Sequence, residues 1–206
     1  MLGARRRWHV NLGTVRQWHW ISSALCLVGM LLFAVTGITL NHAADIPARH
    51  QVTVVEATVP VDMLETWLTD DEPPAVLPVD LRDWLRREHG VILGPRVSGE
   101  WQHGEFYLSL PRPGGDAWLS IDGDSGELLY ERTERGWIAW LNDLHKGRNT
   151  GTAWSWFIDV FAVACVVFCV SGLLLLQRHA RSRPSTWPLT TLGLVIPLLL
   201  ILIFIH

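Results

Sequence analysis

Three long apolar stretches divide this chain of 206 residues. They cover about residues 20–40, 154–177 and 189–205, and each approaches the roughly 20 residues that an α-helix needs to cross a ~30 Å hydrocarbon core. The first stretch is longer than the apolar part of a typical signal peptide and ends in Asn41-His42, where no cleavage site is evident. The pattern therefore predicts a membrane α-helical protein with three transmembrane helices.

Between the first two apolar stretches, the hydrophobic pattern begins with helical spacing. Residues 59–68 and 80–89 fit amphipathic helices, with Asp62 or Asp80 as N-terminal caps and Gly90 as a stop. After them, apolar and polar residues alternate in four stretches separated by turn residues: 96–101, 105–110, 117–121 and 127–131. Short helices followed by an antiparallel meander predict one small α+β domain.

Two further segments of this region carry recognisable patterns. Asp122-Gly-Asp-Ser-Gly126 begins like a calcium-binding loop but lacks the later ligands, so we interpret it as a tight turn, with calcium binding as the alternative. Residues 134–144 carry an apolar stripe at helical spacing, typical of a helix that lies on a membrane surface. Such a helix would bring His145 to that surface.

Arginine residues predict the orientation. They gather before the first stretch and between the second and third: Arg5, Arg6, Arg7, Arg16, Arg178, Arg181 and Arg183. Basic residues in short loops favour the cytoplasmic side, so the N-terminus is expected in the cytoplasm and the α+β domain on the outer side of the membrane. The expected order is a cytoplasmic N-terminus (1–18), a transmembrane helix (19–42), the extracytoplasmic domain (43–133), an interfacial helix and loop (134–152), a second transmembrane helix (153–178), a cytoplasmic loop (179–187) and a third transmembrane helix (188–206).

Four histidines stand at the ends of the first two apolar stretches: His19 and His42 bracket the first, and His145 and His179 bracket the second. If these helices run antiparallel, His19 faces His179 and His42 faces His145. A neutral imidazole can bind a metal through one nitrogen while the other is held by an acceptor. Two facing pairs could therefore hold two haem irons, which would be b-type because the chain has no Cys-x-x-Cys-His motif.

Basic residues stand beside each histidine pair. Lys146 and Arg148 could pair with haem propionates next to His145, and Arg16, Arg178 and Arg181 could do so at the other end. Each residue has a simpler interpretation, as an aromatic-belt neighbour, a topology signal or a solvated group. His19 and His42 are separated by roughly 35 Å of helix, a long distance for one electron transfer step. Two haems, one haem and none all remain open.

The two spans also share a short motif. The first ends in Phe33-Ala-Val-Thr-Gly37 before His42, and the second in Phe168-Cys-Val-Ser-Gly172 before His179. A small-residue pair lets a neighbouring helix or a flat macrocycle approach the backbone closely. Helix packing and a haem-facing role are both consistent with the motif.

These motifs resemble the PepSY-associated transmembrane helix family. The resemblance rests on the Thr-Gly exit motif, on Leu144-His145-Lys-Gly-Arg148 followed by Trp154-Ser-Trp-Phe-Ile-Asp159, and on Asp122 to Glu127 in the polar domain. It implies a PepSY-like extracytoplasmic domain. Larger members include inner-membrane reductases of ferric siderophores with b-type haems between transmembrane histidines. The resemblance thus implies haem b, one or two per chain, and a ferric-chelate reductase that acts in iron uptake.

The partners follow from what the chain lacks. It has no Gly-x-Gly-x-x-Gly after a strand and no phosphate loop, so electrons would come from a membrane quinol or a separate cytoplasmic reductase, and a ferric chelate would accept them. A homo-oligomer is a further expectation, and no nucleic-acid partner is expected. The main alternative is a haem-free, membrane-anchored PepSY regulator that binds a peptidase or a transporter. A second alternative is an accessory subunit that passes electrons to a membrane partner.

Overall fold

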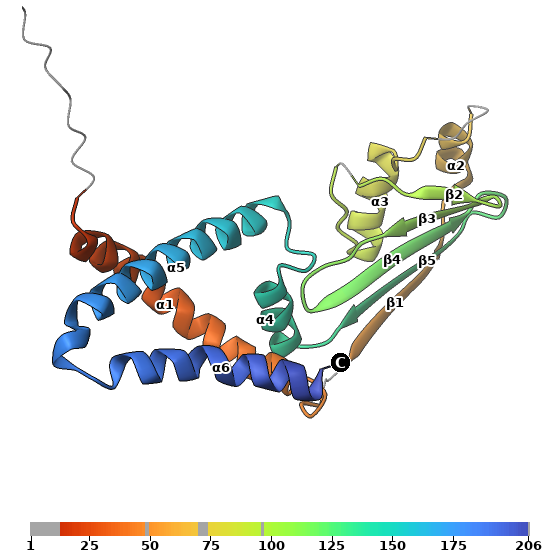
Figure 1. The fold of residues 1–206 in the computed structure, drawn as a ribbon. Helices are drawn as coiled ribbons and strands as arrows, with labels where there is room; N and C mark the ends of the chain where they lie inside the picture. Colours follow the sequence, from red (N-terminus) through yellow and green to blue (C-terminus); the bar gives the residue numbers. More distant parts are fainter. Residues whose placement is uncertain (1–12, 48–49, 70–73, 96, 206) are drawn as a thin grey trace, which may run out of the picture. The chain divides into compact units, whose positions relative to one another are not determined.

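The computed structural model describes residues 13–47, 50–69, 74–95 and 97–205 of the chain (Figure 1). Arg5, Arg6 and Arg7, which contributed to the predicted orientation, lie outside these residues. The chain forms two compact units, one of residues 1–32 with 156–206 and one of residues 33–155. Each unit is described by itself.

Three helices of the described residues are long and apolar enough to cross a membrane: α1 (Val15–Asn41), α5 (Thr152–His179) and α6 (Thr186–Phe204). A short 3-10 turn, η1 (Ala180–Ser182), lies between α5 and α6. α1 and α5 approach each other closely at Gly29, where an added Cβ would lie 2.4 Å from Cε2 of Phe161. The predicted membrane α-helical fold with three spans is confirmed.

The second unit contains a five-stranded antiparallel sheet, in the order β1-β5-β4-β3-β2. Its elements are β1 (Gln51–Thr58), α2 (Val61–Trp67), α3 (Val79–His89), β2 (Glu100–Gln102), β3 (Glu105–Ser109), β4 (Gly115–Asp122) and β5 (Glu127–Glu134). We call residues 51–134 the sheet domain. It is followed by α4 (Trp137–Lys146). The α+β domain predicted between the first two spans is therefore confirmed.

α2 and α3 cover one face of the sheet (Figure 1). Alternate residues of β3 and β4 point toward these helices, so Phe106, Leu108, Leu119 and Ile121 are fully buried. They pack with apolar residues of the two helices and their flanking turns: Val59, Leu64, Trp67, Leu77, Leu81, Leu85 and Val91. The opposite face of the sheet has no such cover among the described helices of the domain.

Two details of the domain differ from the sequence prediction. β1 was not predicted, although five of its eight residues are Val or Thr, which favour strands. Asp62 and Asp80 do not cap the helices, because Pro60 and Pro78 occupy those positions and the aspartates lie in the first turn. Proline suits a helix start since its missing N–H needs no partner there. Gly90 ends α3 in a left-handed conformation, as predicted.

The segment Asp122–Gly126 forms the tight turn that the sequence predicted. The Asp122 carboxylate accepts the Ser125 backbone N–H at 2.7 Å and the Ser125 hydroxyl at 2.8 Å. These bonds hold the pKa of Asp122 below its ordinary value of 3.8, with the backbone bond from Ser125 as the largest cause. The carboxylate is therefore ionised at neutral pH and closes the loop between β4 and β5.

The last residue of β5 predicts how the domain responds to acid. Hydrogen bonds from Arg112, and then from Arg132, hold the pKa of Glu134 below its ordinary value of 4.5. A carboxylate with a depressed pKa stabilises the fold above its unfolded pKa, and this contribution is lost as the pH falls through the lower, folded pKa. In Glu134→Gln, the melting temperature in detergent should fall less between about pH 7 and pH 3 than in the wild type. Equal losses in both proteins would contradict the assigned role.

Candidate functional site

His19, near the start of α1, is held by three residues of α5. Its ring stacks on Phe168, with centroids 4.8 Å apart and planes at 13°. Its Nδ1 lies 3.1 Å from Oγ of Ser171 and 3.3 Å from the Phe168 carbonyl oxygen. The ring also passes close to Gly172, where an added Cβ would lie 3.2 Å from Cε1. An aromatic ring, a hydroxyl and a glycine together form what we call a histidine clamp.

His145, in the last turn of α4, meets the same clamp on α1. Its ring contacts Phe33, with centroids 4.9 Å apart, and its Nδ1 lies 2.7 Å from Oγ1 of Thr36. An added Cβ at Gly37 would lie 3.7 Å from Cε1 of the imidazole. Both clamps consist of the shared motif Phe-x-Val-(Thr/Ser)-Gly. Positions i, i+3 and i+4 of a helix share one face, which is why this spacing gathers the three residues around one ring.

The hydrogen bonds of both clamped rings involve Nδ1. The hydroxyls of Ser171 and Thr36 also lie within donating distance of the carbonyl oxygens of Phe168 and Phe33, at 3.0 and 3.2 Å. A hydroxyl that donates to its helix carbonyl can accept a hydrogen bond from Nδ1–H. In that tautomer the lone pair of the neutral ring lies on Nε2, which has no hydrogen bond to any described residue.

His42 and His179 adopt the same tautomer by a different route. Each directs Nδ1 at the carbonyl oxygen four residues earlier in its own helix, Ile38 at 3.0 Å for His42 and Leu175 at 2.8 Å for His179. A carbonyl only accepts, so Nδ1–H donates here as well. All four predicted histidines thus keep Nε2 available. A metal-binding imidazole is held in this way, with its other nitrogen on an acceptor.

A cavity of about 480 Å³ brings His19 and His179 together. Gly172, Leu175, Leu176, Arg183 and Thr186 complete its lining. Its size lies within the range of about 300–1,000 Å³ that small-molecule sites occupy. The predicted basic residues Arg16 and Arg178 are exposed and are not among the lining residues, whereas Arg183 is. From the sequence, Arg183 was used only to predict the orientation in the membrane, and no role in a cofactor site was expected for it.

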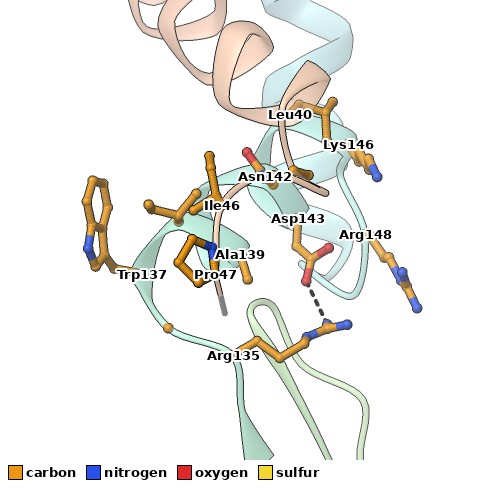
Figure 2. Close-up of a pocket in the computed structure, with 13 residues that line it drawn as sticks. Leu40, Ile46, Pro47, Arg135, Trp137, Ala139, Asn142, Asp143, Lys146 and Arg148 are labelled. Carbon is orange, nitrogen blue, oxygen red and sulfur yellow. Dashed lines mark hydrogen bonds and ion pairs between the residues drawn. The ribbon is translucent and has the colours of Figure 1, made fainter. Parts of the chain in front are cut away.

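A second cavity, of about 510 Å³, lies beside the other histidine pair, between the end of α1 and α4 (Figure 2). Lys146 and Arg148 line it, together with Arg135. In Figure 2 these cations lie on one side and Trp137 on the other. Its remaining lining includes apolar residues such as Leu40, Ala43, Ile46, Pro47 and Ile138. The imidazoles of His42 and His145 are not part of the lining, although residues next to both are.

Polar contacts on two sides fix α4, which carries His145. The buried Asp143 carboxylate accepts the Gly114 N–H at 2.8 Å and an Arg135 N–H at 3.2 Å. On another side of the helix, the Thr39 hydroxyl donates to Oδ1 of Asn142 at 2.8 Å. The clamped imidazole is therefore anchored both to the sheet domain and to the end of α1.

Asp159 lies within the second span and is exposed on α5. An unpaired charge in lipid is costly, so a polar partner for this side chain stays an expectation.

Sequence reasoning found the four histidines and the shared motif but not how they are combined. It considered packing or haem contact for Thr36-Gly37 and Ser171-Gly172, and the structure shows that they receive imidazoles. The available signal was the repeated Phe three residues before the hydroxyl. A stacking ring, a hydrogen-bond acceptor and a gap on one helix face are what an imidazole needs.

One comparison with known proteins gives a match. A family model described as "Putative PepSY_TM-like" covers residues 10–206, nearly the whole chain. No curated protein and no solved structure matches the chain. The resemblance to PepSY-associated transmembrane proteins is confirmed, while the resemblance to haem-containing reductases stays a prediction.

Proposed function

The chain belongs to the PepSY_TM-like family, and from this premise we propose that it is a b-type haem protein that carries electrons across a bacterial inner membrane to ferric chelates. In this proposal the N-terminus is cytoplasmic and the sheet domain is periplasmic. The single observation that supports it best is that all four histidines engage Nδ1 in a hydrogen bond and leave Nε2 without one among the described residues.

The residues around His19 and His179 fit a haem. Both imidazoles line one cavity, Gly172 leaves space in its wall, and Arg183 supplies a cation suited to a propionate. Leu175 and Leu176 provide the apolar part of the lining. These features match the usual design of a cofactor site, which is mostly apolar with a few placed polar groups.

The groups that His42 and His145 could offer to a second haem also fit such a cofactor. Nδ1 of His145 is bonded to Thr36 and Nδ1–H of His42 to the Ile38 carbonyl, and Lys146 and Arg148 stand one and three residues after His145. In the proposal these two cations hold the propionates of a second haem. Arg16 and Arg178 are exposed and would act through their charge near the first pair.

A bound haem would supply a one-electron carrier whose potential depends on its axial ligands and surroundings. The chain's own residues orient the ligands. Ser171 and Thr36 bond Nδ1, Phe168 and Phe33 fix the ring planes, and α4 fixes the place of His145. A quinol or a cytoplasmic reductase would donate the electrons. Reduction loosens a ferric chelate because hard oxygen ligands hold Fe(III) more tightly than Fe(II).

Haem content tests the proposal directly. We expect the protein, purified in detergent from cells well supplied with haem, to be red and to give a b-type pyridine haemochrome spectrum. Two haems per chain would support both histidine pairs, and one would restrict the proposal to a single pair. A colourless protein would overturn the proposal and favour the haem-free regulator.

The hydroxyl of the clamp should matter for haem retention. Thr36→Val removes the acceptor of the His145 Nδ1–H while keeping the side-chain shape. Loss of such a supporting hydrogen bond typically lowers metal-site affinity about 10–100-fold. We therefore expect faster haem loss from the second pair, measured as transfer to apomyoglobin. Thr66→Val is the matched control, since its hydroxyl bonds the Asp62 carbonyl oxygen within α2 instead of a histidine. Equal haem loss in both variants would contradict the role of Thr36.

A further inference from the structure

The sheet face that α2 and α3 leave uncovered carries many carboxylates. Cross-strand partners share a face, so the registers place alternate residues of all five strands on it. Seven of these residues are acidic: Glu56, Glu100, Glu105, Asp116, Asp122, Glu127 and Glu131. No strand residue on this face is Lys or Arg, and none of the seven carboxylates is in an ion pair with a described residue.

On the opposite, helix-covered face, an acidic side chain is in ion pairs with arginines. Glu134, on the helix-covered side, is paired with both Arg112 and Arg132. On the uncovered face, by contrast, Glu105 stands directly opposite Asp122 across β3 and β4. Like charges in this position destabilise a sheet. The uncovered face is therefore unfavourable for the isolated domain and complementary to positive charge.

The same face is hollowed between its acidic residues. A cavity of about 650 Å³ is lined by Glu56, Glu105, Asp122 and Glu127, among others. Ser120 lies in its lining, is only 9% exposed and has no side-chain hydrogen bond to a described residue. Its hydroxyl is not among the buried polar atoms that lack a partner, so it is accessible from the cavity. Ser120 is therefore a polar contact point for a ligand on the cavity wall.

An aromatic pair lies beside the acidic residues. Tyr107 and Trp118 stack with ring centroids 6.1 Å apart, and Tyr107 is exposed. Aromatic faces attract guanidinium and ammonium groups, most strongly when the cation is desolvated. The carboxylates are spread over five strands, and no group of three metal-binding side chains converges among the described residues. This distribution suits several separate cations along a chain better than one metal ion.

We propose that the uncovered sheet face, centred on Ser120, is a docking surface for a basic polypeptide segment of a partner protein in the same compartment. Arginine or lysine side chains of the segment bond the carboxylates of Glu56, Glu105 and Glu127. One of them donates to Ser120, and another lies against Trp118. The proposal is independent of haem binding, because it uses no residue of either histidine pair.

The test uses the full chain in an uncharged detergent and a labelled octa-arginine peptide as the probe, followed by fluorescence anisotropy. The double variant Glu105→Gln/Glu127→Gln removes two charges from the rim of the cavity. Its matched control, Glu65→Gln/Glu88→Gln, removes two exposed charges from α2 and α3 on the other side of the domain. We expect the rim variant to bind about fivefold more weakly at low ionic strength, and the control to bind like the wild type.

Each outcome decides the proposal. Equal weakening in both variants would mean that only net charge attracts the peptide, and it would overturn the proposal. So would the absence of binding at low ionic strength. Competition by calcium ions at low concentration, with loss of that effect in the rim variant, would identify a metal site instead. A further loss in Trp118→Leu, with an unchanged circular dichroism spectrum, would support the docking surface.

Discussion

Replacing His145 with alanine should remove one of the two proposed haems and abolish the reduction of ferric-EDTA added on the side of the sheet domain. The His145 imidazole bonds Thr36 at 2.7 Å and contacts Phe33 in the Phe33–Gly37 clamp, and alanine would supply neither contact. Haem per chain from the pyridine haemochrome spectrum, together with the reduction rate in proteoliposomes, measures both effects.

Two further variants make this result interpretable. His103→Ala changes an exposed histidine at the β2–β3 turn and should leave the absorption spectrum unchanged. His19→Ala should remove the other haem, spare the one at His145 and block electron entry from the cytoplasmic side. Full haem content in His145→Ala would show that this residue is not a ligand.

Replacing Phe106 with alanine should destabilise the sheet domain by about 3–5 kcal/mol, the usual cost of emptying a phenylalanine site in a core. Phe106 is fully buried, and its ring packs against Trp67 and Trp101 at centroid distances of 4.9 and 5.4 Å. A loss of this size is a large part of the 5–15 kcal/mol that usually separates folded from unfolded domains. Urea unfolding followed by near-ultraviolet circular dichroism would measure it.

The adjacent residue provides the control. Tyr107 points to the uncovered face, so Tyr107→Ala should cost only about 1 kcal/mol through its lost stacking on Trp118. Haem at His19 and His179 should survive in Phe106→Ala, because these residues lie in the other unit of the chain. Similar destabilisation by both substitutions would contradict the assigned core.

The spans, the α+β domain and the four histidines could be predicted because each leaves a local pattern. An apolar run of membrane length or an alternation of Phe106, Leu108 and Leu110 is visible without knowing what it packs against. β1 was missed because it is an edge strand without clear alternation, and its register with β5 depends on partners 69 to 83 residues away in the chain. Long-range pairing has no signature within a short window.

The residues of the candidate site were likewise predictable only where the feature is local in the sequence. Histidine positions are local facts, but the choice between Arg178 and Arg183 as a cavity residue depends on how the chain turns after α5. Likewise, the Thr36 hydroxyl could be seen in the sequence, but its bond to an imidazole 109 residues later could not. The repeated motif indicated that the two helix ends have similar roles, but it did not indicate that each binds an imidazole.

The clamps also constrain the order in which this protein can be completed during synthesis. Each clamp holds a histidine from a distant part of the chain. Thr36 is made before its partner His145, and His19 is made before its partner Ser171. At about 5–20 residues per second, the ribosome needs roughly 5–20 s to add the 109 residues between Thr36 and His145. During that interval the first span is in place with one clamp empty and one histidine unheld. The clamp at Thr36 can therefore be filled only after α4 has been made, and the clamp at Ser171 is complete only after most of α5 has been made.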